Sequence, residues 1–192
     1  MPTGRKRAPG ATALIGLDQR LERAIATHRL GLLDPLAIAL SWLGSYGAVW
    51  LVLAFVFALL WRRPSLLIWV GAADLSAYLA VAGLRAVIER PRPPRSFPQI
   101  ETLVSLPHSF SFPSGHTSTS FACAVVLAAA TRSRRTRVLL IALATLIALS
   151  RVYAGVHYPL DIVGGAVLGT AIGLALVALA RVVSPRLGAG RI

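Results

Sequence analysis

The chain has 192 residues, of which 56% are hydrophobic and 14% charged, and its formal net charge at pH 7 is +13. So apolar a composition excludes an ordinary soluble domain of this length and indicates an integral membrane protein. The charge does not indicate nucleic-acid binding, because the basic residues form short runs between apolar segments, without an aromatic-studded basic face. Cys123 is the only cysteine, so the sequence offers no intramolecular disulfide and no cysteine-based metal site.

The amino-terminal part of the chain is predicted to lie outside the membrane core. Residues 1–10 are short, polar and basic and are predicted to be disordered, and no cleavable signal peptide follows them. In residues 11–34, apolar and charged positions alternate at helical spacing, which predicts an amphipathic helix on the membrane surface. The apolar positions are Leu14, Leu17, Leu21 and Ile25, and the charged ones are Asp18, Arg20, Glu22 and Arg23.

The first strongly apolar run, Leu36 to Trp61, is interrupted by Gly44-Ser45-Tyr46-Gly47. It is either one tilted span or a shallow helix followed by a span of about 15 to 20 residues, and we favour the second interpretation. Asp74 lies in the middle of the next run. A carboxylate in the middle of a membrane span is a candidate functional residue. No other motif residue lies at the same depth, so a packing or hydrogen-bonding role is favoured for Asp74.

Further spans are predicted at Ser65–Leu84, Pro113–Thr131, Val138–Leu149 and Tyr158–Val183. Glycines at mostly four-residue spacing in the last one suit close helix packing. The sequence thus predicts an all-α integral membrane protein, a bundle of about five to six transmembrane helices with an N-terminal interfacial amphipathic helix. The transmembrane domain is expected over residues 35–183, with a tail at 184–192.

Arginine-rich turns at 62–63 and 132–137 and the arginine-rich tail are separated by even numbers of crossings, so all three are predicted to be cytoplasmic. The loop from Arg85 to Phe112 and the junction from Ser150 to His157 then lie together on the opposite face. We therefore expect a multi-pass protein of the cell membrane whose functional site is non-cytoplasmic.

That junction carries Arg151, His157 and Asp161 between two apolar segments. An imidazole four residues before a carboxylate can donate one ring N–H to it, which leaves the other nitrogen free as nucleophile or base. Arg151 adds a fork of donors suited to phosphate. On these residues alone, a structural Arg151–Asp161 ion pair with His157 as an interfacial filler explains the pattern equally well.

A second cluster, Pro113-Ser114-Gly115-His116, precedes a long apolar helix. Ser114 is placed to cap that helix, and the N–H groups of Gly115 and His116 then point out of its positive end, where an anion binds. His116 adds a titratable proton. A serine cap beside a chance histidine is the competing interpretation, and for this cluster alone it is the commoner case.

The third cluster, Arg85, Arg90 and Arg92, opens the long, charged, proline-rich loop. Such a loop is more typical of function than of a simple connection. The alternative is that these arginines only snorkel to lipid headgroups.

Together the three clusters resemble the signature motifs of the type 2 phosphatidic acid phosphatase superfamily, which includes glucose-6-phosphatase and the vanadium haloperoxidases. The resemblance covers roughly residues 35–183. The family motifs are Lys, six residues, Arg-Pro; then Pro-Ser-Gly-His; then Ser-Arg, five residues, His, three residues, Asp. They are matched by Arg85 and Arg92-Pro93, by Pro113-Ser114-Gly115-His116, and by Ser150-Arg151, His157 and Asp161.

Arg85 stands where the family has lysine, which keeps the positive charge but changes reach and geometry. Arg90 lies nearby and is a second candidate for that role. The resemblance implies that the phosphate is bound by Arg85, Arg92, Ser114, Gly115 and Arg151.

The resemblance further implies a metal-independent phosphatase without a cofactor. His157 attacks phosphorus to give a phosphohistidine while Asp161 holds its ring. His116 protonates the leaving oxygen and then activates water.

A site at the membrane boundary suits a lipid phosphate or diphosphate, such as undecaprenyl or decaprenyl diphosphate, phosphatidic acid or phosphatidylglycerol phosphate. Phosphotransfer from a polyprenyl diphosphate to an acceptor, and non-catalytic binding or transport of a lipid phosphate, are the alternatives. The expected partners are the bilayer and its lipid phosphates, not nucleic acid, and the sequence does not indicate an oligomeric state.

Overall fold

The computed structural model describes residues 9–183, so the predicted tail and most of the basic amino terminus lie outside the described residues. Within this range the chain forms helices and turns, with no strand. The elements are α1 (Pro9–Thr27), η1 (Gly31–Leu33), α2 (Asp34–Leu43), η2 (Ser45–Gly47), α3 (Ala48–Leu60), α4 (Ser65–Ile88), α5 (Pro93–Ser96), α6 (Gly115–Ala130), α7 (Arg134–Tyr153) and α8 (Pro159–Val183).

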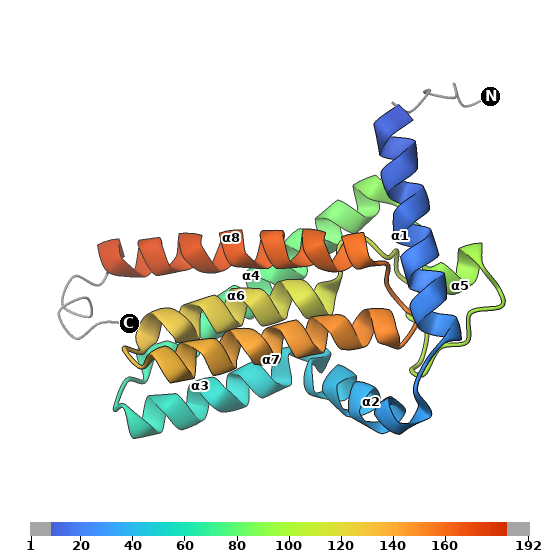
Figure 1. Ribbon diagram of the computed structural model, residues 1–192. Coiled ribbons are helices and arrows are strands. Elements are labelled where there is room, and N and C mark those ends of the chain that lie inside the picture. The colour runs from blue at the N-terminus through green and yellow to red at the C-terminus, as the bar shows by residue number, and fades with distance from the viewer. Residues whose placement is uncertain (1–8, 184–192) are drawn as a thin grey trace.

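The bundle is built around α6, which packs against α4, α7 and α8, while α3 packs on α4 (Figure 1). Small and apolar side chains of α6, including Ala122, Cys123 and Leu127, are completely buried. Its hydroxyl groups are satisfied inside the bundle, as where the indole Nε1 of Trp50 donates to Ser120 Oγ at 3.0 Å. The central helix therefore combines close packing with internal hydrogen bonds, as a helix largely enclosed by an apolar bundle requires.

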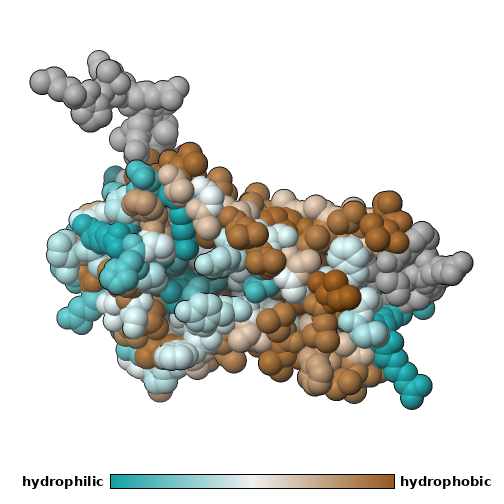
Figure 2. Space-filling view, turned by 180° about the vertical axis from the view of Figure 1, so that it is seen from behind, coloured by the Kyte–Doolittle hydropathy of each residue, from teal (hydrophilic) through white to brown (hydrophobic). Residues whose placement is uncertain are grey.

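The face of the bundle seen in Figure 2 is mostly apolar along its length, whereas polar residues gather at the end next to α1. Three helical stretches, Ser65–Ser96, Arg134–Tyr153 and Pro159–Val183, are long and apolar enough to cross a membrane. The bent pair Gly31–Leu43 and Ser45–Leu60 gives a fourth if it counts as one span. α6 has 16 residues, below the usual spanning length. The predicted count of five to six crossings therefore stays a prediction.

The break between α2 and α3 falls at the predicted glycine pair, and the two halves are bent by 58°. Gly47 has φ +67°, and a Cβ at this position would lie 2.2 Å from Asp74 Oδ1, so both the backbone and the space favour glycine. The break into two helices is confirmed, although α3 has 13 residues and is shorter than expected. That α2 lies shallow in the membrane and α3 crosses it stays a prediction. Asp74 lies against the break, in agreement with a packing role.

Glycines of α8 lie directly against the backbone of α6. A Cβ at Gly165 would be 2.8 Å from the carbonyl oxygen of Ser114, and one at Gly169 would be 2.2 Å from that of Ser118. Gly173 repeats this one turn further, at 2.8 Å from the carbonyl oxygen of Ala122. Close packing through these glycines was predicted, and it joins α6, which begins at the second motif, to α8, whose first turn carries Asp161 of the third motif.

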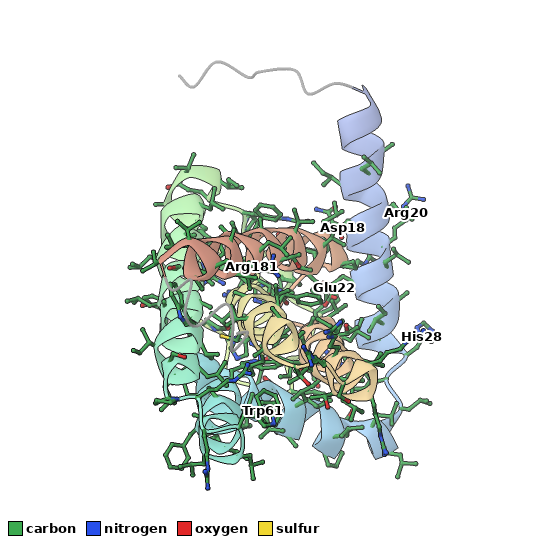
Figure 3. The ribbon with its side chains drawn as sticks, turned by 90° about the vertical axis from the view of Figure 1, so that its left-hand side faces the viewer. Asp18, Arg20, Glu22, His28, Trp61 and Arg181 are labelled. Atoms are coloured by element: carbon green, nitrogen blue, oxygen red, sulfur yellow. The ribbon has the colours of Figure 1, made fainter. Side chains whose placement is uncertain are left out.

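Helix α1 crosses the end of the bundle almost perpendicular to α7 and α8 and packs against both (Figure 1). Asp18 and Glu22 point towards the bundle, whereas Arg20 and His28 point away (Figure 3). The two carboxylates are 3% and 0% exposed, while Leu14 is 60% exposed. The amphipathic pattern is therefore present, but its acidic residues contact protein; whether α1 lies in the membrane interface stays a prediction.

Candidate active site

The three motif clusters converge at the end of the bundle that carries α1 and α5 (Figure 1). Arg85 lies in the last turn of α4, and Arg92 immediately precedes α5. The second motif begins α6, while Arg151 lies in the last turn of α7. His157 occupies the short connection to α8, whose first turn holds Asp161. Residues far apart in sequence are thus placed together because the ends of antiparallel helices meet.

His157 is buried and held from both sides. Its Nδ1 lies 3.3 Å from Asp161 Oδ2, and its Nε2 lies 3.1 Å from Arg92 Nη1. The same Asp161 oxygen accepts the backbone N–H of Tyr158 at 2.9 Å. Because a guanidinium only donates hydrogen bonds, Nε2 must be the unprotonated nitrogen, and the ring proton lies on Nδ1 facing the carboxylate. This tautomer presents a lone pair at Nε2.

The charge state of His157 agrees with this tautomer. Burial, followed by the positive charges of Arg92, Arg151 and Arg85, lowers the pKa of His157 well below its ordinary value. The imidazole is therefore neutral near pH 7. A neutral, oriented imidazole beside several arginines is suited to attack an electrophile that brings negative charge with it.

Arg92 is buried and makes an extended set of hydrogen bonds. It donates to the backbone oxygens of Val156, Ser109 and Phe110 at 2.9, 2.8 and 3.2 Å, as well as approaching His157. Its Nη2 also reaches Ser109 Oγ at 3.1 Å. The hydrogen bonds fix the guanidinium over the imidazole, so its place does not depend on a bound anion.

Arg85 shares a partner with Arg92, because its Nη1 donates to Ser109 Oγ at 3.2 Å. Its Nε donates to the carbonyl oxygen of Pro113 at 3.2 Å, while Nη2 lies beside Gly115. A guanidinium can hold the loop and face the start of α6 at the same time, which a lysine ammonium could not do with comparable geometry. Ser109 was not singled out in the sequence, where one serine in a polar loop carries no signal.

The start of α6 differs from the sequence expectation in one respect. Ser114 is the N-cap residue, but its side chain accepts no hydrogen bond from the helix backbone, so the predicted serine cap is wrong. Its Oγ instead accepts from Thr117 Oγ1 at 3.0 Å, and its backbone N–H donates to the carbonyl oxygen of Asp161 at 3.0 Å. The serine therefore ties α6 to α8.

The broken helix α2–α3 brings two serines to the motif residues. Neither serine was predicted from the sequence. Ser45 Oγ lies 3.4 Å from His116 Nε2, and Ser41 Oγ accepts a hydrogen bond from Arg151 Nη1. Arg151 is buried, and its Nε has no hydrogen-bond partner among the described residues. A buried donor without a partner is costly, and an incoming anion would satisfy it. The interruption at 44–47 was the only available signal for this contact.

Arg90, the second candidate for the first motif, takes a different position from Arg85 and Arg92. Its Nη1 donates to Asp161 Oδ1 at 2.6 Å, and its Nη2 pairs with Asp18 Oδ2. Its guanidinium carbon lies 4.1 Å from the centre of the Tyr158 ring. Both ends of its fork are thus occupied by carboxylates.

A histidine–carboxylate pair facing clustered arginines, at the polar end of an apolar bundle, defines a membrane enzyme acting on phosphate groups. Within residues 9–183, no group of three or more His, Cys, Asp or Glu side chains is placed to hold a metal ion. The positive charge at the site comes from the arginines.

Comparisons with known proteins agree with this class. Residues 66–183 match the family model described as the PAP2 superfamily. The chain is 40% identical, over 131 residues, to a decaprenylphosphoryl-5-phosphoribose phosphatase of Mycolicibacterium smegmatis, covering 67% of this chain and 69% of the relative. It is 29% identical, over 163 residues, to an undecaprenyl-diphosphatase of Sulfolobus acidocaldarius, covering 84% and 77% of the two chains.

Among solved structures, Aquifex aeolicus LpxE is similar with a TM-score of 0.74 at 32% identity, over 84% of this chain and 95% of that one. The chain therefore belongs to the PAP2 superfamily. It is a phosphatase, and the resemblance noted in the sequence is confirmed.

Proposed function

We propose that the protein removes phosphate from polyprenyl-linked phosphates or diphosphates in the membrane, by way of a phosphohistidine on His157. The observation that carries this proposal is the contact between Arg92 Nη1 and His157 Nε2 in a buried, arginine-lined site. The apolar bundle supports a lipid substrate, and relatives that act on decaprenyl- and undecaprenyl-linked substrates favour a polyprenyl chain over a diacylglycerol one.

In the first step, a phosphate oxygen takes over the donor of Arg92 and uncovers the lone pair of His157 Nε2. Nε2 then attacks phosphorus, and the bond from phosphorus to the leaving oxygen breaks. Asp161 stabilises the positive charge that develops on the ring. His116 gives its proton to the leaving oxygen, and the charge of the bound phosphate favours the protonated form of that histidine.

In the second step, His116 takes a proton from water as the water attacks phosphorus. The phosphorus–nitrogen bond breaks, inorganic phosphate leaves, and His157 returns to its neutral form. Throughout, the equatorial oxygens are held by Arg85, Arg92, Arg151, the Gly115 N–H and Ser114. In this proposal the arginines supply the charge stabilisation that metal ions give other phosphoryl-transfer enzymes.

The substrate is tested with the full-length protein in detergent micelles and a panel of lipid phosphates. Release of inorganic phosphate should have its highest kcat/KM for polyprenyl-linked phosphates, compared with phosphatidic acid and phosphatidylglycerol phosphate, and should be absent in His157→Ala. Turnover of the diacyl lipids alone would overturn the polyprenyl assignment. Label passing from substrate to an added acceptor, instead of to water, would identify a phosphotransferase.

We further propose that the site faces the non-cytoplasmic side of the cell membrane, because the arginine-rich turn between α6 and α7 lies at the opposite end of the bundle. Cysteine labelling in intact cells checks this, since native Cys123 is fully buried. A membrane-impermeant thiol reagent should modify Ser105→Cys, in the exposed loop, but not Ser133→Cys, in the turn. The reverse pattern would invert the topology.

A further inference from the structure

Asp18 of α1 is connected to the candidate catalytic residues by a continuous set of buried contacts. Arg90 bridges Asp18 and Asp161, and Asp161 in turn holds the ring of His157. The other Asp18 oxygen, Oδ1, accepts the backbone N–H of Leu160 at 2.8 Å. Asp18 thus contacts Arg90, which is the partner of Asp161, and also the first turn of α8, the helix on which Asp161 lies.

The helix is fixed over this junction at a second point. Arg29, just beyond α1, donates through Nε to the carbonyl oxygen of Tyr153 and through Nη2 to that of Glu101, both at 2.8 Å. Tyr153 is the last residue of α7, and Leu160 lies in the first turn of α8. The connection that carries His157 is therefore spanned by α1 and the residues just after it, with Asp18 anchored to α8 on one side and Arg29 to the end of α7 on the other.

We propose that Asp18 is a positioning residue, which sets the geometry of the His157–Asp161 pair by sharing Arg90 with Asp161. The inference rests on the roles proposed above for His157 and Asp161. Nothing in the α1 sequence pattern assigns this task, because a carboxylate on an amphipathic helix is ordinarily solvated.

One cation, Arg90, is divided between the carboxylates of Asp18 and Asp161. With Asp18 present, the fork of Arg90 is split, and Asp161 can keep Oδ2 on the imidazole while Oδ1 takes one guanidinium nitrogen. Without the charge of Asp18, Asp161 is the one anion that pairs with the largely buried Arg90 among residues 9–183. The guanidinium then pairs with both oxygens of Asp161, because arginine–carboxylate pairs favour two parallel hydrogen bonds. This pairing moves Oδ2 away from His157.

Glu22 provides a matched control, one turn along the same face of α1. It is completely buried, and neither carboxyl oxygen has a hydrogen-bond partner among the described residues. Burial raises the pKa of Glu22 to about 8, since the opposing effect of Arg29 is smaller. Glu22 is therefore mostly uncharged near pH 7, and Glu22→Gln keeps both its shape and its charge.

The experiment uses the full-length enzyme in detergent with p-nitrophenyl phosphate, so that the identity of the natural lipid does not enter. Asp18→Asn retains an oxygen for Leu160 but loses the charge. It should lower kcat on the order of tenfold, as when a group that orients a catalytic histidine is lost, with KM within about twofold. Asp18→Glu should recover most of this loss, and Glu22→Gln should resemble the wild type.

The decisive comparison is made in an Arg90→Gln background. Because Asp18 acts through Arg90, adding Asp18→Asn to Arg90→Gln should lower kcat no further. Equal losses in the two backgrounds, a change confined to KM, or a wild-type kcat in Asp18→Asn would each overturn the proposal. If Asp18→Asn gives no folded protein, Arg90→Gln alone carries the test: its kcat must fall at constant KM, whereas a raised KM would make Arg90 a phosphate ligand.

Failure of the proposed function gives a different result. A wild type that turns over p-nitrophenyl phosphate but no polyprenyl phosphate refutes the lipid assignment and leaves the Asp18 comparison intact. Undiminished activity of His157→Ala would refute the catalytic roles, and the positioning role with them.

Discussion

His157→Ala should abolish the phosphoenzyme and lower the turnover of a lipid phosphate by at least about 10⁴-fold, the scale of losing a covalent nucleophile. Among residues 9–183, the side chains that hydrogen-bond to the ring are an arginine, which only donates, and a carboxylate already paired with Arg90, so neither is placed to replace the imidazole. The measurement is rapid quenching with a ³²P-labelled lipid phosphate, followed by assignment of alkali-stable, acid-labile counts to a peptide.

His108→Ala is the matched control, since His108 lies exposed in the loop at the same end of the molecule. It should retain both label and turnover. Undiminished label in His157→Ala, or label found on a peptide containing His116, would reverse the roles proposed for the two histidines.

His116→Ala should instead allow the phosphoenzyme to accumulate. The variant lacks the proton donor of the first step and the base of the second, so lipid turnover should fall by about 10² to 10⁴. With p-nitrophenyl phosphate the first step persists, because p-nitrophenolate leaves without being protonated. Hydrolysis of the phosphohistidine then becomes limiting.

Stopped-flow absorbance follows this directly. His116→Ala should release about one equivalent of p-nitrophenol per enzyme in a burst, followed by a slow steady state. Ser45→Ala, which removes the hydroxyl beside His116 Nε2 at 3.4 Å, should turn over without such a burst. A linear time course in His116→Ala, at a rate close to the wild type, would remove His116 from the second step.

Much of this architecture could be predicted because apolar runs and motif spacing are local signals. The runs predicted from Ser65 and Tyr158 correspond to α4 and α8, and the break at 44–47 is present. The convergence of the three motifs was predicted by counting the membrane crossings between them, because segments separated by an even number of crossings lie on the same side of the membrane. The serine cap failed because a neighbouring hydroxyl, Thr117, competes for the same oxygen.

The contacts of α1 could not be predicted from its amphipathic pattern. A helix on the membrane surface turns its apolar face to lipid and its charged face to water, and that would leave Asp18 and Glu22 solvated. In a membrane protein, an apolar face can remain exposed to lipid, and the pattern no longer says which side meets the protein. The deciding partner of Asp18 is Arg90, 72 residues away in sequence, and no local rule connects them.

The backbone contact between α6 and α8 has a consequence for how such an enzyme can change its substrate. Gly165, Gly169 and Gly173 of α8 bring no side chain of their own to their contacts with the carbonyl oxygens of α6, so at these points main-chain atoms set the spacing between the two helices. Substitutions elsewhere do not readily alter that spacing. The broken α2–α3 segment and the long loop before α6 are not part of this glycine contact. Apart from Ser41, Ser45 and Ser109, which touch the motif residues, they can therefore vary without changing that spacing.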